Sequence, residues 1–107
     1  MNDKVASLIG FAVKSGKIIY GLESLEEGKR KRYLIVCCHT LSERAKLSVK
    51  KVAQRDGVFI VETKARKLED IVYKNNCKVI GISNKQMADA IINFITEDYS
   101  LIKSEEI

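Results

Sequence analysis

The stretch "YLIVCCHTLSERAKLSVKKVAQRDGVFIV" at residues 33–61 contains two continuous apolar runs separated by a polar segment with helical spacing. Apolar runs that do not alternate with polar residues are typical of strands buried on both faces. Ser42 is suited to cap the intervening helix, and Gly57 is suited to end it. A helix that connects two buried strands predicts parallel pairing with a right-handed crossover, so this stretch indicates an α/β protein.

Signals of helix and strand alternate in the same way along the rest of the chain. The expected strands are residues 17–20, 33–38, 58–61 and 78–82. The expected helices follow Asp3, Gly21, Ser42 and Asn84, with a further helix at residues 66–75. We predict a three-layer α/β/α sandwich with a small mixed, mainly parallel four-stranded sheet. Ligands of such sheets bind at the loops that follow the strands, here residues 20–24, 38–42, 62–66 and 83–85.

Length and composition predict one soluble domain. The 107 residues are enough for a single hydrophobic core, and no proline or linker-like segment divides them. We expect the domain to cover residues 1–98 and residues 99–107 to form a loosely ordered tail. No apolar run reaches the roughly 18 residues of a membrane span, and the first residues do not resemble a signal peptide. Three cysteines without a pairing pattern favour a reducing, cytoplasmic location.

The charge of the chain is positive and uneven. The net charge is +5, and residues 1–51 carry 11 Lys and Arg against 5 Asp and Glu. Residues 52–107 carry 8 Lys and Arg against 9 Asp and Glu. A basic excess favours a polyanionic partner, and its position predicts a phosphate-facing surface in the N-terminal half. The alternative is that the lysines only keep a small protein soluble.

The run Cys37-Cys38-His39 raises the question of a metal or catalytic site. Successive residues of a strand point to opposite faces, so Cys37 and Cys38 are poorly placed to share an ion. A Cys-His nucleophile would need Cys38 and His39 to be turned toward each other. We expect both cysteines to be buried apolar residues. The phosphate-binding patterns G-x-x-x-x-G-K-[ST] and G-x-G-x-x-G are absent, so we predict no enzyme activity, no cofactor and no metal.

Basic residues gather at three places in the N-terminal half. Lys14 and Lys17 flank Gly16, and "GKRKR" at residues 28–32 precedes the apolar strand. The helix after Ser42 carries Arg44, Lys46, Lys50 and Lys51, for which a solvated helix face is the favoured interpretation. Lysine and arginine side chains that neutralise phosphates supply the part of nucleic-acid affinity that is independent of sequence.

The segment "YGLES" at residues 20–24 places Gly21 where a strand turns into a helix. Glycine permits close approach of a ligand to the backbone, and the first N–H groups of a helix are free. Glu23 and Ser24 would project from the first turn, where they can bond to base edges. Helix capping is the alternative role of both side chains.

Four segments resemble the kink-turn-binding ribosomal protein family, which includes ribosomal proteins L-seven-Ae and L-thirty-e and small bacterial RNA-binding relatives. The segments are "LIGFAVKSGKIIYGLES" (residues 8–24), "YLIVCCHTLSERAKLSVKKVA" (33–53), "GVFIVETKARKLEDI" (57–71) and "CKVIGISNKQMADAI" (77–91). The resemblance implies an α/β/α sandwich and non-catalytic binding to sheared G·A pairs of a kinked RNA. It also implies contacts from residues 21–24 and 40–42.

Several positions depart from the family pattern. Glu23 stands where Asn or Lys is usual, Ser24 where Glu or Gln is usual, and Glu27 where Lys is usual. Thr40 stands where an acidic residue is usual, whereas Leu41 keeps the apolar contact. These departures bear on which RNA is preferred and leave the fold untouched.

The sequence therefore predicts a monomeric, ribosome-associated protein that binds structured RNA of the kink-turn type, with ribosomal RNA as its partner and no membrane contact. The alternative is a protein-interaction module on the same scaffold. The expected nucleic-acid-binding residues are Lys14, Lys17, Gly21, Leu22, Glu23, Ser24, Lys29, Arg30, Lys31, Thr40, Leu41, Ser42 and Lys64.

Overall fold

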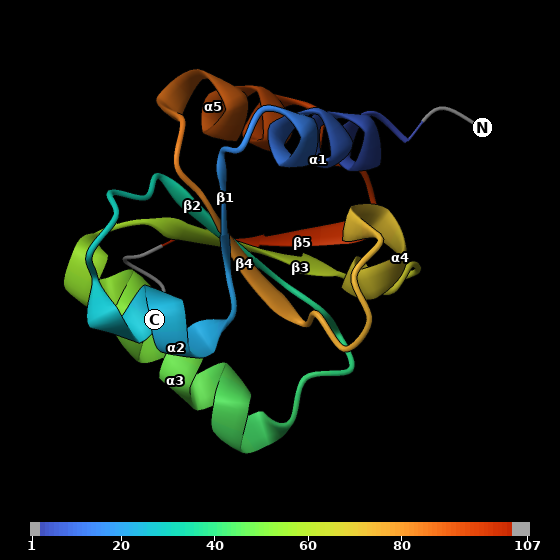
Figure 1. The fold of residues 1–107 in the computed structure, drawn as a ribbon. Helices are drawn as coiled ribbons and strands as arrows, with labels where there is room; N and C mark the ends of the chain where they lie inside the picture. The colour runs from blue at the N-terminus through green and yellow to red at the C-terminus, as the bar shows by residue number, and fades with distance from the viewer. Residues whose placement is uncertain (1–2, 104–107) are drawn as a thin grey trace.

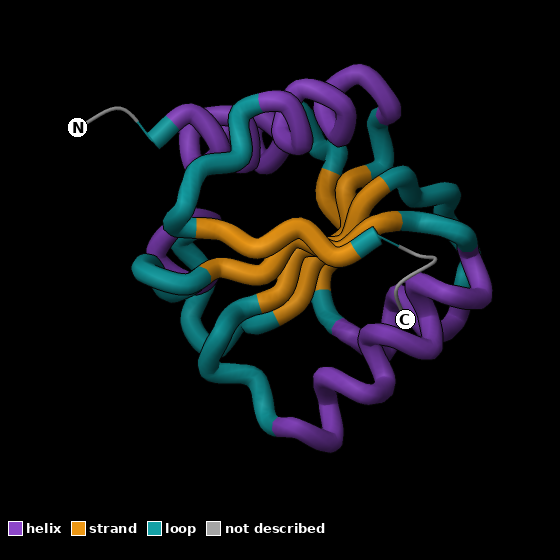
Figure 2. The backbone as a smooth tube through the Cα atoms, turned by 180° about the vertical axis from the view of Figure 1, so that it is seen from behind, coloured by secondary structure: helices purple, strands orange, loops and turns teal. Residues whose placement is uncertain are grey.

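Residues 3–103, which the computed structural model describes, form a five-stranded sheet with helices on both faces (Figure 1). The elements are α1 (Lys4–Lys14), β1 (Ile18–Tyr20), α2 (Leu22–Glu27), β2 (Leu34–Cys37), α3 (Glu43–Asp56), β3 (Phe59–Thr63), α4 (Leu68–Val72), β4 (Val79–Ile82), α5 (Lys85–Asn93) and β5 (Tyr99–Ile102). Helices α1, α4 and α5 cover one face, and α2 and α3 cover the other. The predicted α/β sandwich is confirmed, and Figure 2 shows the strands stacked between the two helical layers.

The sheet separates two apolar clusters, because side chains of each strand alternate between its faces. In β2, Leu34 and Val36 pack on the side of α1 and α5, whereas Ile35 and Cys37 pack on the side of α2 and α3. All four are buried, as expected for a strand covered on both faces. Cys38 lies in the cluster opposite to Cys37, so the prediction that these cysteines face apart is confirmed.

The strand order is β1-β4-β2-β3-β5, and only the β2–β3 pair is parallel. The parallel pair predicted from residues 33–61 is confirmed, but the prediction of a mainly parallel sheet is wrong. Helix α4 has five residues and spans about 7.5 Å, less than half of the about 17 Å length of β3. It does not carry the chain back along the sheet, so β4 starts where β3 ended and runs in the opposite direction.

The predicted count of four strands and the tail from residue 99 are also corrected. Residues Tyr99–Ile102 form β5, which pairs antiparallel with β3 at the edge of the sheet. The Tyr99 hydroxyl donates a hydrogen bond to Asp3 at 2.6 Å, which fastens this strand to the start of α1. The remaining part of the predicted tail, residues 104–107, lies outside the described residues.

These directions give the sheet two functionally different ends. We call the end where β1, β2 and β3 finish and β4 and β5 begin the loop edge, and the other end the opposite edge. Residues 20–24, 38–42 and 62–66 therefore meet at the loop edge as predicted. Residues 83–85 follow β4 and lie at the opposite edge, because β4 is reversed. Within residues 3–103, every helix is too short to cross a lipid bilayer.

Candidate functional site

Two of the predicted loops are fastened to one segment at the loop edge. The Gly21 N–H donates to the Val79 carbonyl at 3.0 Å, and the Cys38 N–H donates to the Lys78 carbonyl at 2.8 Å. The loop after β1 and the loop after β2 are thus anchored on both sides of the chain that leads into β4. Gly21 adopts a φ of +87°, which favours glycine over any residue with a Cβ atom.

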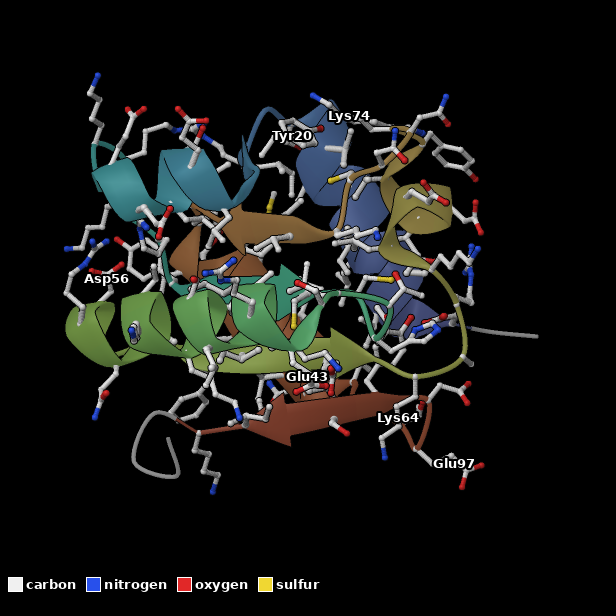
Figure 3. The ribbon with its side chains drawn as sticks, turned by 90° about the horizontal axis from the view of Figure 1, so that it is seen from below. Tyr20, Glu43, Asp56, Lys64, Lys74 and Glu97 are labelled. Carbon is white, nitrogen blue, oxygen red and sulfur yellow. The ribbon has the colours of Figure 1, made fainter. Side chains whose placement is uncertain are left out.

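A hollow of about 420 Å³ lies between these segments. Gly21 and Leu22 line it from the start of α2, Leu41 lines it from the loop before α3, and residues 74–79 line it from the chain before β4. The Lys74 ammonium lies 4.3 Å from the centre of the Tyr20 ring, a cation–π contact that holds both side chains at the rim. Figure 3 shows Tyr20 and Lys74 together at this end of the sheet.

The other residues predicted in these loops have different surroundings. Glu23 and Ser24 are exposed on the first turn of α2. The Ser42 hydroxyl accepts a hydrogen bond from the Ala45 N–H at 3.1 Å, so it caps α3. The Thr40 hydroxyl lies 3.1 Å from the Cys38 sulfur. Only the apolar and glycine positions therefore enter the hollow, while the polar ones stand at its margin or complete the scaffold.

Lys74, Asn75, Asn76 and Lys78 belong to the same surface but were not predicted from the sequence. Asn76 has a φ of +61°, and its N–H donates to the Glu69 carboxylate at 2.8 Å, which fixes the turn before β4. The signal that pointed to this segment was "KNNCK" itself, a polar turn directly before a buried strand. It was overlooked because a parallel β4 would have placed this turn at the opposite edge.

Lys46 at the start of α3 pairs with Glu62 and Glu43, whereas four other lysines of the loop edge are free of charge partners in the described part of the chain. Within residues 3–103, no acidic side chain forms an ion pair with any of them. These lysines are Lys64, Lys67, Lys74 and Lys78, all of which are exposed. Lys64 was predicted, and its backbone N–H donates to the Asp98 carbonyl at 2.9 Å. Figure 3 shows its side chain close to the label of Glu97 at this end of the molecule. All four come from the C-terminal half, so the charge excess of the N-terminal half does not locate the cations of this edge.

Arg30, which was predicted to bind nucleic acid, and Arg32 of the same basic run belong to the scaffold of the opposite edge. Arg30 donates to the Ile18 carbonyl at 3.0 Å and to the Ser83 hydroxyl at 3.1 Å. Arg32 is only 6% exposed, donates to the Leu25 carbonyl at 2.6 Å and forms an ion pair with Asp56 at 3.2 Å. Figure 3 shows Asp56 at the end of the molecule remote from Lys74 and Lys64. The structure therefore places Arg30 and Arg32 of the basic run away from the hollow beside Gly21, with their guanidinium groups bonded to backbone carbonyls.

The predicted lysines of the N-terminal half lie near those arginines or on α1. Lys29 forms an exposed ion pair with Glu27 at 3.4 Å, and the Lys31 ammonium lies 5.7 Å from the centre of the Tyr33 ring. The Lys17 carbonyl accepts from the Ser83 N–H, which places Lys17 at the opposite edge. Lys14 is the last residue of α1. None of the four lies among the residues that line the hollow.

The adjacent cysteines have thiols of opposite character. Burial raises the pKa of the Cys37 thiol to about 12, so this side chain behaves as an apolar core residue. Burial also acts to raise the pKa of Cys38, but hydrogen bonds from Thr40, Leu68 and Thr63 outweigh it and lower that pKa below its ordinary value. His39 Nδ1 lies 3.2 Å from the Thr63 hydroxyl. Among residues 3–103, no three His, Cys, Asp or Glu side chains are grouped as metal ligands.

Comparison with known proteins relates the fold to solved structures. The chain matches no protein-family model and no curated protein. It is similar to a solved protein with unknown function from Bacillus halodurans, with a TM-score of 0.74 and 15% sequence identity. The match covers 87% of this chain and 97% of that chain. At this identity the similarity shows a shared fold and leaves function to be argued from the loop edge.

Proposed function

We propose that the loop edge binds structured RNA of the kink-turn type without catalysing a reaction. One observation carries this proposal: Gly21, Leu22 and Leu41 come from loops far apart in the sequence and line one hollow beside Lys74 and Lys78. The resemblance to kink-turn-binding ribosomal proteins implies RNA contacts from the same glycine and leucines. Geometry and resemblance therefore support the same surface.

The chemistry of this surface suits RNA with unpaired or sheared bases. The apolar side chains of Leu22 and Leu41 offer van der Waals contact to base faces. Gly21 lets a sugar-phosphate chain approach the backbone closely. Exposed lysines around the hollow neutralise phosphates. The exposed amides of Asn75 and Asn76 supply donors and acceptors from a turn whose backbone is bonded to Glu69. Binding by this surface would weaken steeply as salt concentration rises.

The target is proposed on narrower grounds. The resemblance supports ribosomal RNA as the partner and the cytoplasm as the place where the protein acts. Glu23, Ser24 and Thr40 replace the residues with which kink-turn binders read sheared pairs, so we propose a preference that differs in detail from theirs. Glu23 is exposed at the start of α2, where its negative charge disfavours a nearby phosphate.

A titration of the purified protein against a kink-turn RNA and a straight duplex of equal length, at two salt concentrations, tests this proposal. We expect the kink-turn RNA to bind more tightly at both concentrations. Equal and salt-sensitive binding of both RNAs would show a general RNA surface with another preferred target. Absence of binding at low salt would reject RNA as the partner and favour the alternative, a protein-interaction module in which Glu23 and Glu27 repel RNA.

A further inference from the structure

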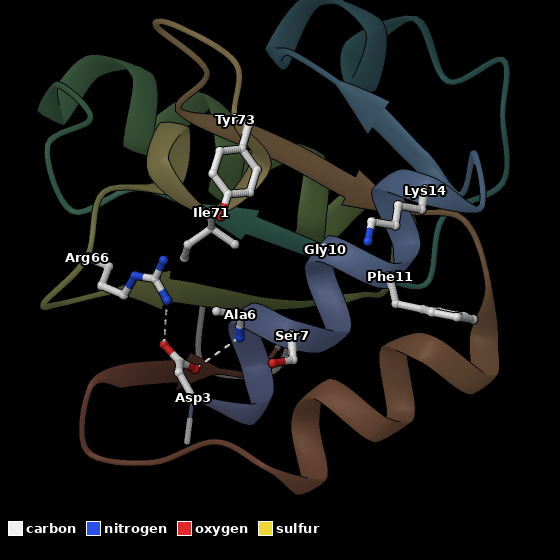
Figure 4. A pocket seen from close by; sticks show the side chains of 9 residues that line it. All are labelled: Asp3, Ala6, Ser7, Gly10, Phe11, Lys14, Arg66, Ile71 and Tyr73. Carbon is white, nitrogen blue, oxygen red and sulfur yellow. Dashed lines mark hydrogen bonds and ion pairs between the residues drawn. The ribbon is translucent and has the colours of Figure 1, made fainter. Parts of the chain in front are cut away.

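A second groove, of about 480 Å³, lies between α1 and α4, away from the hollow at the loop edge. Figure 4 shows Ala6 and Gly10 of α1 along one side and Ile71 and Tyr73 of the α4 segment along the other. Tyr73 is followed directly by Lys74, which lines the hollow at the loop edge. Neighbouring residues of the chain, Tyr73 and Lys74, therefore line the groove and the proposed RNA surface respectively.

Tyr73 has an unusual conformation and environment. It ends α4 with a φ of +55°, in the left-handed region where a residue with a large side chain is uncommon. Its side chain is 89% exposed, so burial of the ring does not stabilise this conformation. The ring stands beside Ile71 at the groove, and it presents an aromatic face to solvent (Figure 4). Exposed aromatic faces are the platforms on which single-stranded nucleic acids stack their bases.

Gly10 keeps the groove open. It occupies the middle of α1, where glycine is unfavourable for a helix. A Cβ atom added there would meet no atom within 4 Å, so the packing of α1 does not require glycine. A longer side chain at this position would extend into the groove. Glycine is therefore explained by the space that it leaves in front of Tyr73.

Cations stand at the two ends of the groove. Lys14 makes no ion pair with any residue of 3–103, and Figure 4 shows its ammonium directed toward the groove. At the other end, Arg66 reaches Asp3 at 3.5 Å through one nitrogen and keeps its other donors available. The Asp3 carboxylate already accepts from Tyr99 and from the Ala6 N–H. Phe11, 59% exposed, adds a second aromatic ring on the side of Lys14.

We propose that this groove binds a single-stranded RNA segment that flanks the structured RNA held at the loop edge. The inference rests on the proposed function and extends it to a second surface. A base stacks on Tyr73, Gly10 leaves room for it, and Lys14 and Arg66 contact the phosphates on either side. Separated cations around an exposed ring are complementary to a chain that alternates bases and phosphates. A peptide helix would instead require a continuous apolar stripe.

Affinity measurements with two RNAs test the inference. One RNA is a blunt kink-turn, and the other carries five unpaired nucleotides at each end of the same kink-turn. We expect the flanked RNA to bind about tenfold more tightly, since stacking of one base typically contributes this much or more. Tyr73→Asn, which tolerates the left-handed conformation, and Gly10→Gln, which fills the groove, should each remove the gain and leave blunt RNA binding unchanged. Lys51→Gln on α3 is the charge control and should change neither.

An NMR titration with a five-nucleotide oligouridine separates failure of this inference from failure of the proposed function. In the native protein, we expect the oligouridine to shift the amide signals of Gly10 and Tyr73. In Tyr73→Asn, we expect the Gly10 signal to stay unmoved. If the blunt RNA binds and the flanks add nothing, the groove proposal is overturned while the proposed function stands. If neither kink-turn RNA binds, the proposed function fails, and an unmoved Gly10 signal would overturn the groove as well. If the Gly10 signal shifts with protein concentration and does not respond to RNA, the groove binds a second copy of the chain. That result would also overturn the groove proposal.

Discussion

Both ends of the sheet carry basic side chains, but these side chains have different partners at the two ends. At the opposite edge, Arg30 and Arg32 donate to backbone carbonyls, and Arg32 also pairs with Asp56. At the loop edge, Lys74 and Lys78 are exposed beside a hollow and have no acidic partner among residues 3–103. The density of cations in the sequence therefore does not locate a binding surface, because a cation already bonded within the fold has little left to offer a ligand.

The chemistry of the two residue types explains this division. Arginine has a planar group with five N–H donors, which can satisfy several carbonyl oxygens at once. Arg32 does so at the end of α2, where the Leu25 carbonyl has no partner inside the helix. Lysine is a strongly hydrated point charge on a flexible stem, and it remains in solvent unless a partner is close. Four predictions test the difference between the two edges.

Arg32→Met should have the largest effect, and on stability. It removes the buried donor to the Leu25 carbonyl, both side-chain donors to the Arg30 carbonyl and one of the two cationic partners of Asp56, of which Arg55 is the other. We expect the free energy of unfolding to fall by about 3 kcal/mol. Chemical denaturation measures this, with Lys31→Met as a control that should change stability by less than about 0.5 kcal/mol. Equal, small effects of both substitutions would show that Arg32 is not part of the scaffold.

Replacement of Lys74 and Lys78 by alanine should affect RNA binding and leave folding intact. We expect each substitution to weaken RNA binding about tenfold and to reduce its salt dependence, because each substitution removes a phosphate contact. The double substitution of Lys29 and Lys31 at the opposite edge is the matched control and should leave affinity nearly unchanged. Gel-shift titration at two salt concentrations gives both quantities. A larger loss from the control pair would reverse the assignment of the two edges.

The loop edge also contains a partly buried polar cluster of Asp3, Tyr99 and Arg66, which makes a test by pH possible. Burial acts to raise the pKa of Asp3, but the hydrogen bonds from Tyr99, Ala6 and Arg66 outweigh it and hold that pKa below its ordinary value. A carboxyl group with a lowered folded-state pKa stabilises the fold fully above its ordinary pKa of 3.8 and loses this contribution as pH falls through the lowered value.

Burial and the neighbouring Asp3 raise the pKa of Tyr99. The Asp3–Tyr99 hydrogen bond therefore has an acid pH limit, set by Asp3, and an alkaline pH limit, set by Tyr99. The contribution of Tyr99 is complete below its ordinary pKa of 10.0 and is lost as pH rises through the raised value. Between these two pH limits, Tyr99→Phe should therefore lower the free energy of unfolding by about 1.5 kcal/mol. Below the lower limit and above the upper limit, the two proteins should differ less in their free energy of unfolding. Urea denaturation across pH measures this difference. A constant difference at all pH values would show that the Asp3–Tyr99 bond does not contribute.

The smallest effect concerns the rate at which the two neighbouring thiols react. Cys38 has a lowered pKa and lies at the loop edge beside Thr40 and Lys78, whereas the pKa of Cys37 is raised to about 12 by burial. Because the thiolate is the reactive form, we expect iodoacetamide to label Cys38 about tenfold faster than Cys37 near pH 8. Mass spectrometry of the labelled peptide, with Cys37→Ala and Cys38→Ala as references, gives the two rates. Faster labelling of Cys37 would contradict the assigned environments.

Part of the candidate site was predictable because it depends on local pattern. Gly21 stands between a strand and a helix, and Leu41 precedes a capped helix, so both were placed at strand ends from the sequence. The roles of Arg30 and Arg32 were not predictable, since their partners are carbonyls and a carboxylate that the fold brings to them from elsewhere in the chain. Lys74 and Lys78 were missed because their position depends on the direction of β4.

The sequence by itself determined the layered architecture, the β2–α3–β3 unit and the opposite orientation of Cys37 and Cys38. These follow from side-chain periodicity and from capping residues, which act over a few positions. Only the tertiary structure decided that β4 is antiparallel, that β5 joins the sheet and that the cations of "GKRKR" divide between scaffold and solvent. Each of these depends on contacts between distant segments, whose free energy is set by mutual packing and is not encoded in any short stretch.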